Sequence, residues 1–199
     1  MRHGTIPSGE IATVRIIPTA GFEGMMVSEV YLIRHATAEP TRIGQNDSDR
    51  NLTATGIAEA TQVADCLQAL GIVIDVIRCS PLARAQQTAQ IIAHHYALPM
   101  TIDQRLAPGF DYSIVQNYAH SRLHRSIAFV AHQPDLAWIV WSATGVQHEF
   151  ACAGIVRLEP ATPRWRLAFA LAPYTQERIV AGQNDPWTEV TRLGEPLDG

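Results

Sequence analysis

The chain has 199 residues, of which 47% are hydrophobic and 17% are charged, and its formal net charge is −4. These values are typical of a globular domain and exclude a disordered chain or a strongly basic nucleic-acid-binding protein. No stretch of the sequence approaches the ~18 uncharged apolar residues of a membrane-spanning helix. Because the first residues also lack the apolar run of a secretory signal, we expect a cytoplasmic protein that binds neither nucleic acid nor membrane.

The two ends of the chain differ in pattern from its middle. Residues 1–28 carry scattered Gly, Pro and Thr with weak periodicity and precede the first convincing strand. Residues from 173 onward carry Pro, Gly and charges without periodicity. We therefore expect an N-terminal extension over 1–28, a folded domain over 29–172, and a C-terminal tail over 173–199 that wraps the surface or frays.

Candidate strands and helices alternate through the middle of the chain. Apolar runs predict four strands, at Val30–Ile33, Val73–Cys79, Met100–Ile102 and Ile127–Val130. Helical spacing predicts a helix from Thr53 to about Gly71, one opening at Ser80-Pro81, and two more at Tyr112–Leu123 and Asp135–Ala143. A strand pair, Gly154–Leu158 and Trp165–Leu171, follows. The pattern predicts a single three-layer α/β/α domain whose mostly parallel sheet carries an added antiparallel pair.

Several side chains have an expected structural role. The spacing of Ile57, Ala60, Ala64, Leu67 and Gly71 predicts the buried stripe of the first helix. The three cysteines show no C-x-x-C spacing, so we expect reduced thiols and neither a disulfide framework nor a zinc site. The aromatic residues of the apolar helix are expected to pack in the core, namely Trp138 and Trp141.

Polar side chains of matching type follow three of the predicted strands. Arg34 and His35 follow the first strand, Ser80 and Arg84 the second, and His132 the fourth. In a parallel arrangement these strand ends open on one edge of the sheet, where α/β proteins build ligand sites. Guanidinium groups donate in a fork that suits phosphate oxygens, and a neutral imidazole beside them is a nucleophile. The sequence thus predicts transfer of a phosphoryl group to histidine.

Five short motifs extend this pattern. They are LIRHA at 32–36, RNLTxxG at 50–56, SPLARAQQTA at 80–89, FVAHQP at 129–134 and AGIVRL at 153–158. Together and in this order they resemble the histidine phosphatase superfamily, and within it the SixA-type phosphohistidine phosphatases. The resemblance implies a phosphoglycerate mutase-like fold for this domain.

The resemblance also implies roles for individual residues. His35 would attack phosphorus and become phosphorylated, and water would then hydrolyse the phosphoenzyme. We expect the neighbouring arginines to keep His35 neutral, and a bound phosphate dianion to favour the cationic form of His132. No metal or other cofactor is implied, because the side chains supply the positive charge. The remaining implied residues surround the phosphoryl oxygens or bind substrate: Arg34, Arg84, His132, Arg50 and Ser80.

The chain departs from the family pattern at two places. Ala36 follows the nucleophile where the superfamily usually carries Gly, a change that the phosphohistidine branch tolerates. Ala107-Pro108 stands where the mutase and phosphomonoesterase branch carries a Glu as general acid. An ester leaving group needs that proton for a factor of about 10²–10⁴ in rate, whereas the imidazole of phosphohistidine can be protonated before it departs. Asp111 is a candidate substitute acid.

These features predict hydrolysis of phosphohistidine on a protein, a phosphotransfer domain or carrier of a signalling relay. Anions of the phosphate, sulfate or vanadate type are expected to bind in the same pocket. Two alternatives stay open. One is a small-molecule phosphomonoesterase or mutase that uses Asp111 as acid, and the other is a non-catalytic module that binds phosphoproteins.

Overall fold

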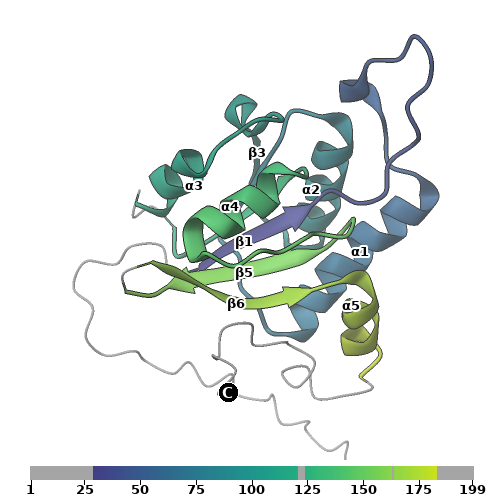
Figure 1. Ribbon diagram of the computed structural model, residues 1–199. Coiled ribbons are helices and arrows are strands. Elements are labelled where there is room, and N and C mark those ends of the chain that lie inside the picture. The colour runs from purple at the N-terminus through teal and green to yellow at the C-terminus, as the bar shows by residue number, and fades with distance from the viewer. Residues whose placement is uncertain (1–28, 121–123, 163, 183–199) are drawn as a thin grey trace, which may run out of the picture.

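The computed structural model describes residues 29–120, 124–162 and 164–182. The expected extension over 1–28 and the end of the expected tail, 183–199, lie outside the described residues. In the described part of the chain, helices cover both faces of a central sheet (Figure 1). The predicted three-layer α/β architecture is therefore confirmed.

Six strands form the sheet in the order β3-β2-β4-β1-β5-β6. They are β1 (Glu29–Arg34), β2 (Val76–Cys79), β3 (Met100–Ile102), β4 (Ser126–Ala131), β5 (Ile155–Pro160) and β6 (Trp165–Leu171). The first four are parallel, whereas β5 pairs antiparallel with β1 and β6 antiparallel with β5. The mostly parallel sheet with its added antiparallel pair is confirmed, and β1, β2 and β4 end on one edge.

The helices of the described residues divide between the two faces of the sheet. One face carries α1 (Ala54–Ala69), α2 (Ala83–Tyr96) and α5 (Pro173–Val180). The other face carries α3 (Tyr112–Ala119) and α4 (Asp135–Thr144). Two short 3-10 turns, η1 (Asp47–Asp49) and η2 (Gln104–Leu106), lie in the loops after β1 and β3.

The central strands are buried on both faces. In β1, Tyr31 and Ile33 pack into the core beneath α1 and α2, and Val30 and Leu32 pack into the core beneath α3 and α4. All six residues of β4 are buried. Strands enclosed by two helical layers are apolar without alternation, which is why these segments form continuous hydrophobic runs in the sequence.

The predicted burial is wrong at three residues. Ile57, expected in the buried stripe of α1, lies in the first turn of the helix and is 52% exposed. Gly71, expected in the same stripe, lies beyond the end of α1 and is exposed, whereas Ala60, Ala64 and Leu67 are buried as expected. Val73 is also exposed, because the second strand begins at Val76 and not at Val73.

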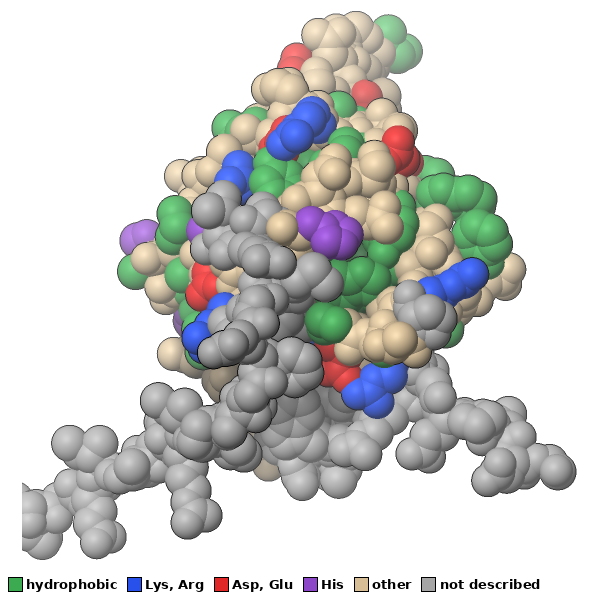
Figure 2. Space-filling model, turned by 90° about the vertical axis from the view of Figure 1, so that its left-hand side faces the viewer, with side chains coloured by type: hydrophobic (Ala, Val, Ile, Leu, Met, Phe, Trp, Pro, Cys, Tyr) green, Lys and Arg blue, Asp and Glu red, His purple; other side chains and the backbone are tan. Residues whose placement is uncertain are grey.

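The expectation that Trp138 and Trp141 pack in the core is also wrong. Both are exposed, and their rings stack on each other with centroids 4.7 Å apart. The face of α4 toward the sheet is already filled by smaller residues, so the tryptophans lie on its outer side; the buried ones are Leu136, Ile139, Val140 and Ala143. On the face shown in Figure 2, acidic, basic and hydrophobic side chains are interspersed.

The expectation of an aperiodic tail from Pro173 is wrong for its first eight residues, which form α5. Pro173 begins this helix, where its missing N–H costs no hydrogen bond. Ile179 is buried in the core that α1 also covers, and the buried Gln176 side chain donates to the carbonyl oxygens of Ala153 and Leu171, at 2.8 and 3.2 Å. The helix is too short for its periodicity to stand out in the sequence.

Gly56 fixes α1 against the loop that follows the nucleophile motif. A Cβ built on Gly56 would lie 2.0 Å from the carbonyl oxygen of Thr37. Thr53 caps the helix from the same place, because its Oγ1 accepts a hydrogen bond from Gly56 N, and its own backbone N–H donates to Thr37 O. The glycine of the RNLTxxG motif thus permits a backbone-to-backbone contact that no side chain could replace.

We predict that Gly56→Ala destabilises the protein by about 1–3 kcal/mol, because the methyl group meets rigid backbone atoms. Urea unfolding measures the change. Thr55→Ala, an exposed neighbour in the same turn, is the matched control and should change stability by less than about 0.5 kcal/mol. Equal stability of Gly56→Ala and the wild type would contradict the close approach.

Candidate active site

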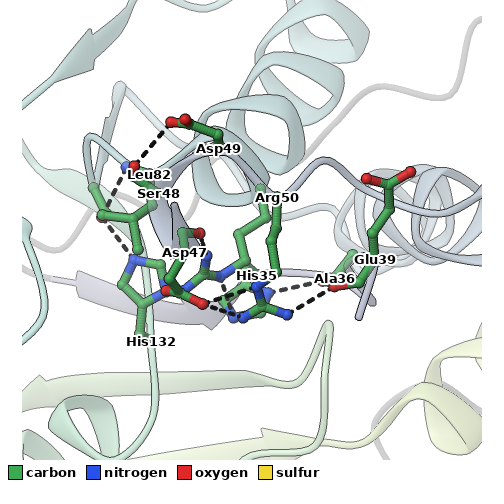
Figure 3. A network of polar contacts seen from close by, with 11 residues as sticks. His35, Ala36, Glu39, Asp47, Ser48, Asp49, Arg50, Leu82 and His132 are labelled. Atoms are coloured by element: carbon green, nitrogen blue, oxygen red, sulfur yellow. Dashed lines mark hydrogen bonds and ion pairs between the residues drawn. The ribbon is translucent and has the colours of Figure 1, made fainter. Parts of the chain in front are cut away.

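Three strand ends bring the predicted site residues to one edge of the sheet. Backbone hydrogen bonds continue the strand pairing past the last ladder residues: His35 N donates to Ala131 O, and Ser80 N donates to Val130 O, both at 3.0 Å. The ring centroids of His35 and His132 lie 5.1 Å apart. Figure 3 shows the two imidazoles with Asp47 and Arg50 around them.

Hydrogen bonds fix both the tautomer and the orientation of His35. Its Nδ1 lies 2.8 Å from the carbonyl oxygen of Ala36, which can only accept, so Nδ1 carries the proton. The lone pair of Nε2 then accepts a hydrogen bond from Arg84 Nε at 3.2 Å. The side of the ring toward Arg84 therefore carries an unprotonated nitrogen, the form that a nucleophilic imidazole needs.

His35 is buried, and its pKa is lowered to about 4. Burial is the largest cause, and the positive charges of Arg84, Arg34 and Arg50 add to it, whereas the hydrogen bond to Ala36 O acts in the opposite direction. The neutral imidazole expected from the sequence agrees with this direction. Desolvation lowers the pKa of His35 more than any single arginine does.

His132 is held by Ser80. Its Nε2 lies 2.6 Å from Ser80 Oγ, which also accepts from Leu82 N at 3.3 Å. The Ser80 hydroxyl can donate its own proton to Nε2 while it accepts from Leu82, and the proton of a neutral ring then lies on Nδ1. Nδ1 is buried and has no partner among the described residues. Ser80 thus positions His132 and leaves it one free donor.

Burial also lowers the pKa of His132, to about 3, and the charges of His35 and Arg84 lower it further. The ring is therefore neutral in the protein alone. The expected cation is the form that a bound phosphate dianion would favour, since the dianion would oppose these causes.

Arg34 and Arg84 enter the site from a strand and a helix, respectively. Arg34 is the last residue of β1, and its Nη1 donates to Phe150 O at 2.7 Å, while its buried Nε has no partner among the described residues. Arg84 lies in the first turn of α2 and is buried. Thr88 supports it from the next turn: Thr88 Oγ1 donates to Arg84 O and accepts from Ala36 N.

Asp47 is a site residue that the sequence reasoning missed. Its Oδ2 accepts from Arg84 Nη2 at 2.8 Å, its backbone carbonyl accepts from Arg84 Nη1 at 2.7 Å, and its Oδ1 accepts from Arg50 Nε at 2.8 Å. Arg50 also donates to Glu39 O. Arg50 thus reaches Arg84 through Asp47. The available signal was an acidic residue three positions before Arg50, in the loop after the nucleophile.

The structure does not join Asp111 to this cluster. Asp111 is exposed at the start of α3, where its carboxylate accepts from the backbone N–H and the hydroxyl of Ser113. These hydrogen bonds lower its pKa. Its observed contacts are those of a helix cap.

The described residues contain no group of three or more His, Cys, Asp and Glu side chains that could hold a metal ion. None of the helices in the described part of the chain is long and apolar enough to cross a membrane. Cys66 and Cys79 are buried, and burial raises their pKa values to about 12 and about 11, which fits the inert thiols expected from the sequence.

Comparison with known proteins defines the class to which this fold and site belong. Residues 30–128 match the family model of the histidine phosphatase superfamily (branch 1). An uncharacterised protein of Picosynechococcus sp. is 34% identical over 145 residues, which cover 68% of this chain and 87% of that protein. The chain belongs to the histidine phosphatase superfamily, and it is a phosphatase with a histidine nucleophile.

The chain is also similar to two proteins that carry different names. The crystal structure of the "putative phosphohistidine phosphatase SixA" of Agrobacterium tumefaciens superimposes with a TM-score of 0.67 at 26% identity, covering 75% of this chain and 100% of that one. The "Probable phosphoglycerate mutase GpmB" of Enterobacter sp. (strain 638) is 42% identical over 80 residues. That match covers 39% of this chain and 36% of GpmB, about a third of its length.

We predict that both site imidazoles titrate well below pH 6.5, the ordinary value for histidine. With folded pKa values of about 4 and about 3, the unfolded chain binds more protons than the folded one as pH falls below about 6.5. The stability that these groups contribute is therefore present above that pH and is lost as pH falls toward 4. NMR titration of the ring protons measures the pKa values, and urea unfolding across this range measures the stability. A ring titrating near 6.5 would contradict the burial argument.

Proposed function

We propose that the protein is a metal-independent phosphohistidine phosphatase that acts on a phosphorylated protein, a phosphotransfer domain or carrier. His35 Nε2 attacks phosphorus, a new P–N bond forms, and the bond to the substrate imidazole breaks with its electron pair going to the departing nitrogen. Water then attacks the phosphorus atom on His35, the P–Nε2 bond breaks with its electron pair returning to Nε2, and inorganic phosphate leaves. The structural support is the tautomer fixed by Ala36 O, which leaves Nε2 unprotonated.

The charges around His35 suit a phosphoryl group in transfer. The guanidinium groups of Arg84 and Arg34 supply forked hydrogen-bond donors, and Nδ1–H of His132 supplies a further single donor. All three groups can stabilise the negative charge that develops on the phosphoryl oxygens in the transition state. Arg34 Nε and His132 Nδ1 are buried without partners in the described structure, so both can donate to an anion without breaking an existing bond. Ser80 acts through His132, and Arg50 acts at the rim.

The single observation that carries the substrate class is the position of Asp111, the acid named from the sequence, which caps α3 and lies outside the cluster around His35. The carboxylate within the cluster is that of Asp47; its partial burial raises its pKa, but the hydrogen bonds and charges of Arg84 and Arg50 lower it more. An ionised carboxylate cannot protonate an alkoxide leaving group. Phosphohistidine needs no such acid, because protonation of its other ring nitrogen lets the imidazole leave as a neutral molecule. The likeness to the SixA structure supports the same substrate class.

A small-molecule phosphomonoesterase or mutase is the second candidate, because part of the chain is similar to GpmB. It requires a general acid, and Asp111 is the residue named for it from the sequence. The lowered pKa of Asp111 and its contacts with Ser113 argue against that role. Family membership favours an enzyme over the non-catalytic phosphoprotein-binding module.

We predict that wild-type protein removes phosphate from a histidine-phosphorylated phosphotransfer domain far faster than from phosphoglycerate or a sugar phosphate. His35→Ala should lower this turnover by about 10³-fold or more and should abolish acid-labile phosphate trapped on the enzyme. His94→Ala, an exposed histidine of α2, is the matched control and should retain full turnover.

Preference for the small phosphate esters would overturn the phosphohistidine assignment. In that case Asp111→Asn should lower ester hydrolysis by about 10²–10⁴-fold, whereas under our proposal it leaves phosphohistidine turnover unchanged. Acid-labile phosphate trapped equally on His35→Ala would overturn the assignment of the nucleophile.

A further inference from the structure

The carboxylate of Asp47 occupies hydrogen-bond donors that an oxyanion would use. Three oxygen acceptors converge on the two guanidinium groups: Oδ2 and the backbone carbonyl on Arg84, and Oδ1 on Arg50. This is the forked geometry in which arginine binds phosphate. Figure 3 shows the side chain of Asp47 close to His35 and Arg50.

Arg84 has few other donors to offer. A guanidinium carries five N–H groups; the Nε–H of Arg84 donates to His35, and one N–H on each terminal nitrogen donates to Asp47. Two N–H groups remain, one on each terminal nitrogen, and a phosphoryl group that takes the forked pair of donors now bound to Asp47 must replace it. The neighbouring donors Arg34 Nε and His132 Nδ1 carry no such competitor among the described residues.

The two partners of this ion pair differ in how firmly they are held. The side chain of Arg84 is 6% exposed, whereas that of Asp47 is 54% exposed. Arg84 is also held by its place in α2 and by the hydrogen bond that Thr88 Oγ1 donates to its backbone carbonyl. Asp47 lies on η1, whose three residues are all exposed, in a loop between β1 and α1. Displacement therefore moves Asp47 toward water, where its charge is well solvated, and leaves Arg84 in place.

We propose that Asp47 is a specificity-determining residue that competes with the substrate's phosphoryl group for Arg84 and so selects against small phosphate-bearing anions. The proposal rests on the proposed function only in assigning Arg84 to the phosphoryl group. A small anion brings no contacts besides those to its phosphate, so the whole cost of displacing Asp47 falls on its affinity. A phosphorylated protein makes further contacts outside the pocket that offset this cost.

The opposite role for Asp47 gives an effect of opposite sign. A residue that merely orients Arg84 would weaken anion binding when it is removed, because the guanidinium would lose its alignment. An internal competitor strengthens anion binding when it is removed. The direction of the change therefore separates the two roles.

The test is isothermal titration of the whole protein with tungstate, a tetrahedral oxyanion, in a buffer free of phosphate. Asp47→Asn should lower the Kd for tungstate by about tenfold, equivalent to about 1.4 kcal/mol. Asp49→Asn is the matched control: it removes the same charge from the same 3-10 turn, but its carboxylate bonds to Ser48 and Asn46. We expect it to change the Kd by less than about twofold. Asp47→Ser is a second variant, in case the amide of Asn still holds Arg84.

Unchanged or weaker tungstate binding in both Asp47 variants, with thermal unfolding like that of the wild type, would overturn the proposal. An equal gain in Asp47→Asn and Asp49→Asn would also overturn it, because the effect would then be one of net charge. This readout uses no phosphohistidine substrate. A negative tungstate result therefore does not contradict the predicted preference for phosphohistidine. A negative result in the comparison of phosphorylated substrates likewise does not contradict the tungstate result.

Discussion

The parallel pairing of β1 with β4 and of β4 with β2 is the constraint on which the rest of the structure depends. It places the carboxyl ends of three strands, which are far apart in the sequence, on one edge of the sheet. The pairing extends one residue beyond the ladders, through His35 N and Ser80 N. The sheet therefore holds the backbone of the site, and the side chains at the three strand ends start close to one another.

Burial then sets the chemistry of the histidines. A ring within the apolar edge of the sheet loses its hydration, so the neutral form is favoured before any charged neighbour acts. The arginines add to the same effect, and the carbonyl of Ala36 selects which nitrogen stays unprotonated. The same burial that stabilises the central strands thus prepares a nucleophile, and one stretch of β-structure serves both the core and the reaction.

The polar network around Arg84 combines a rigid part with a solvated part. From inside the fold, Thr88 holds the backbone carbonyl of Arg84, and His35 accepts a hydrogen bond from its guanidinium. Asp47 and Arg50 approach it from the loop after β1, which also carries the close contact between Thr37 and Gly56. Since α1 is anchored at that contact, the loop is tied at its base and exposed at η1. An anion arriving at the site meets the exposed part first.

Several elements could be predicted from the sequence because their signals are local. The apolar runs of β1 and β4 are continuous because both faces of these strands are buried. The bounds of β3 and β6 are those predicted from the sequence. The exposed Trp138 and Trp141 could not be predicted, since an apolar helix does not reveal which of its faces lacks a covering partner. The helix after Pro173 was missed because its anchoring contacts come from distant residues such as Ala153.

The sequence by itself determined the class of the protein and the identity of the candidate site, because His35, Arg34, Arg84 and His132 lie in motifs that can be read along the chain. Only the tertiary structure decided the protonation and the hydrogen-bond partners of these groups. The tautomer of His35, the role of Ser80 as a support for His132, and the presence of Asp47 on Arg84 each depend on a distance between two segments. Spacing along a chain carries no such information, since it is the fold that chooses which segments meet.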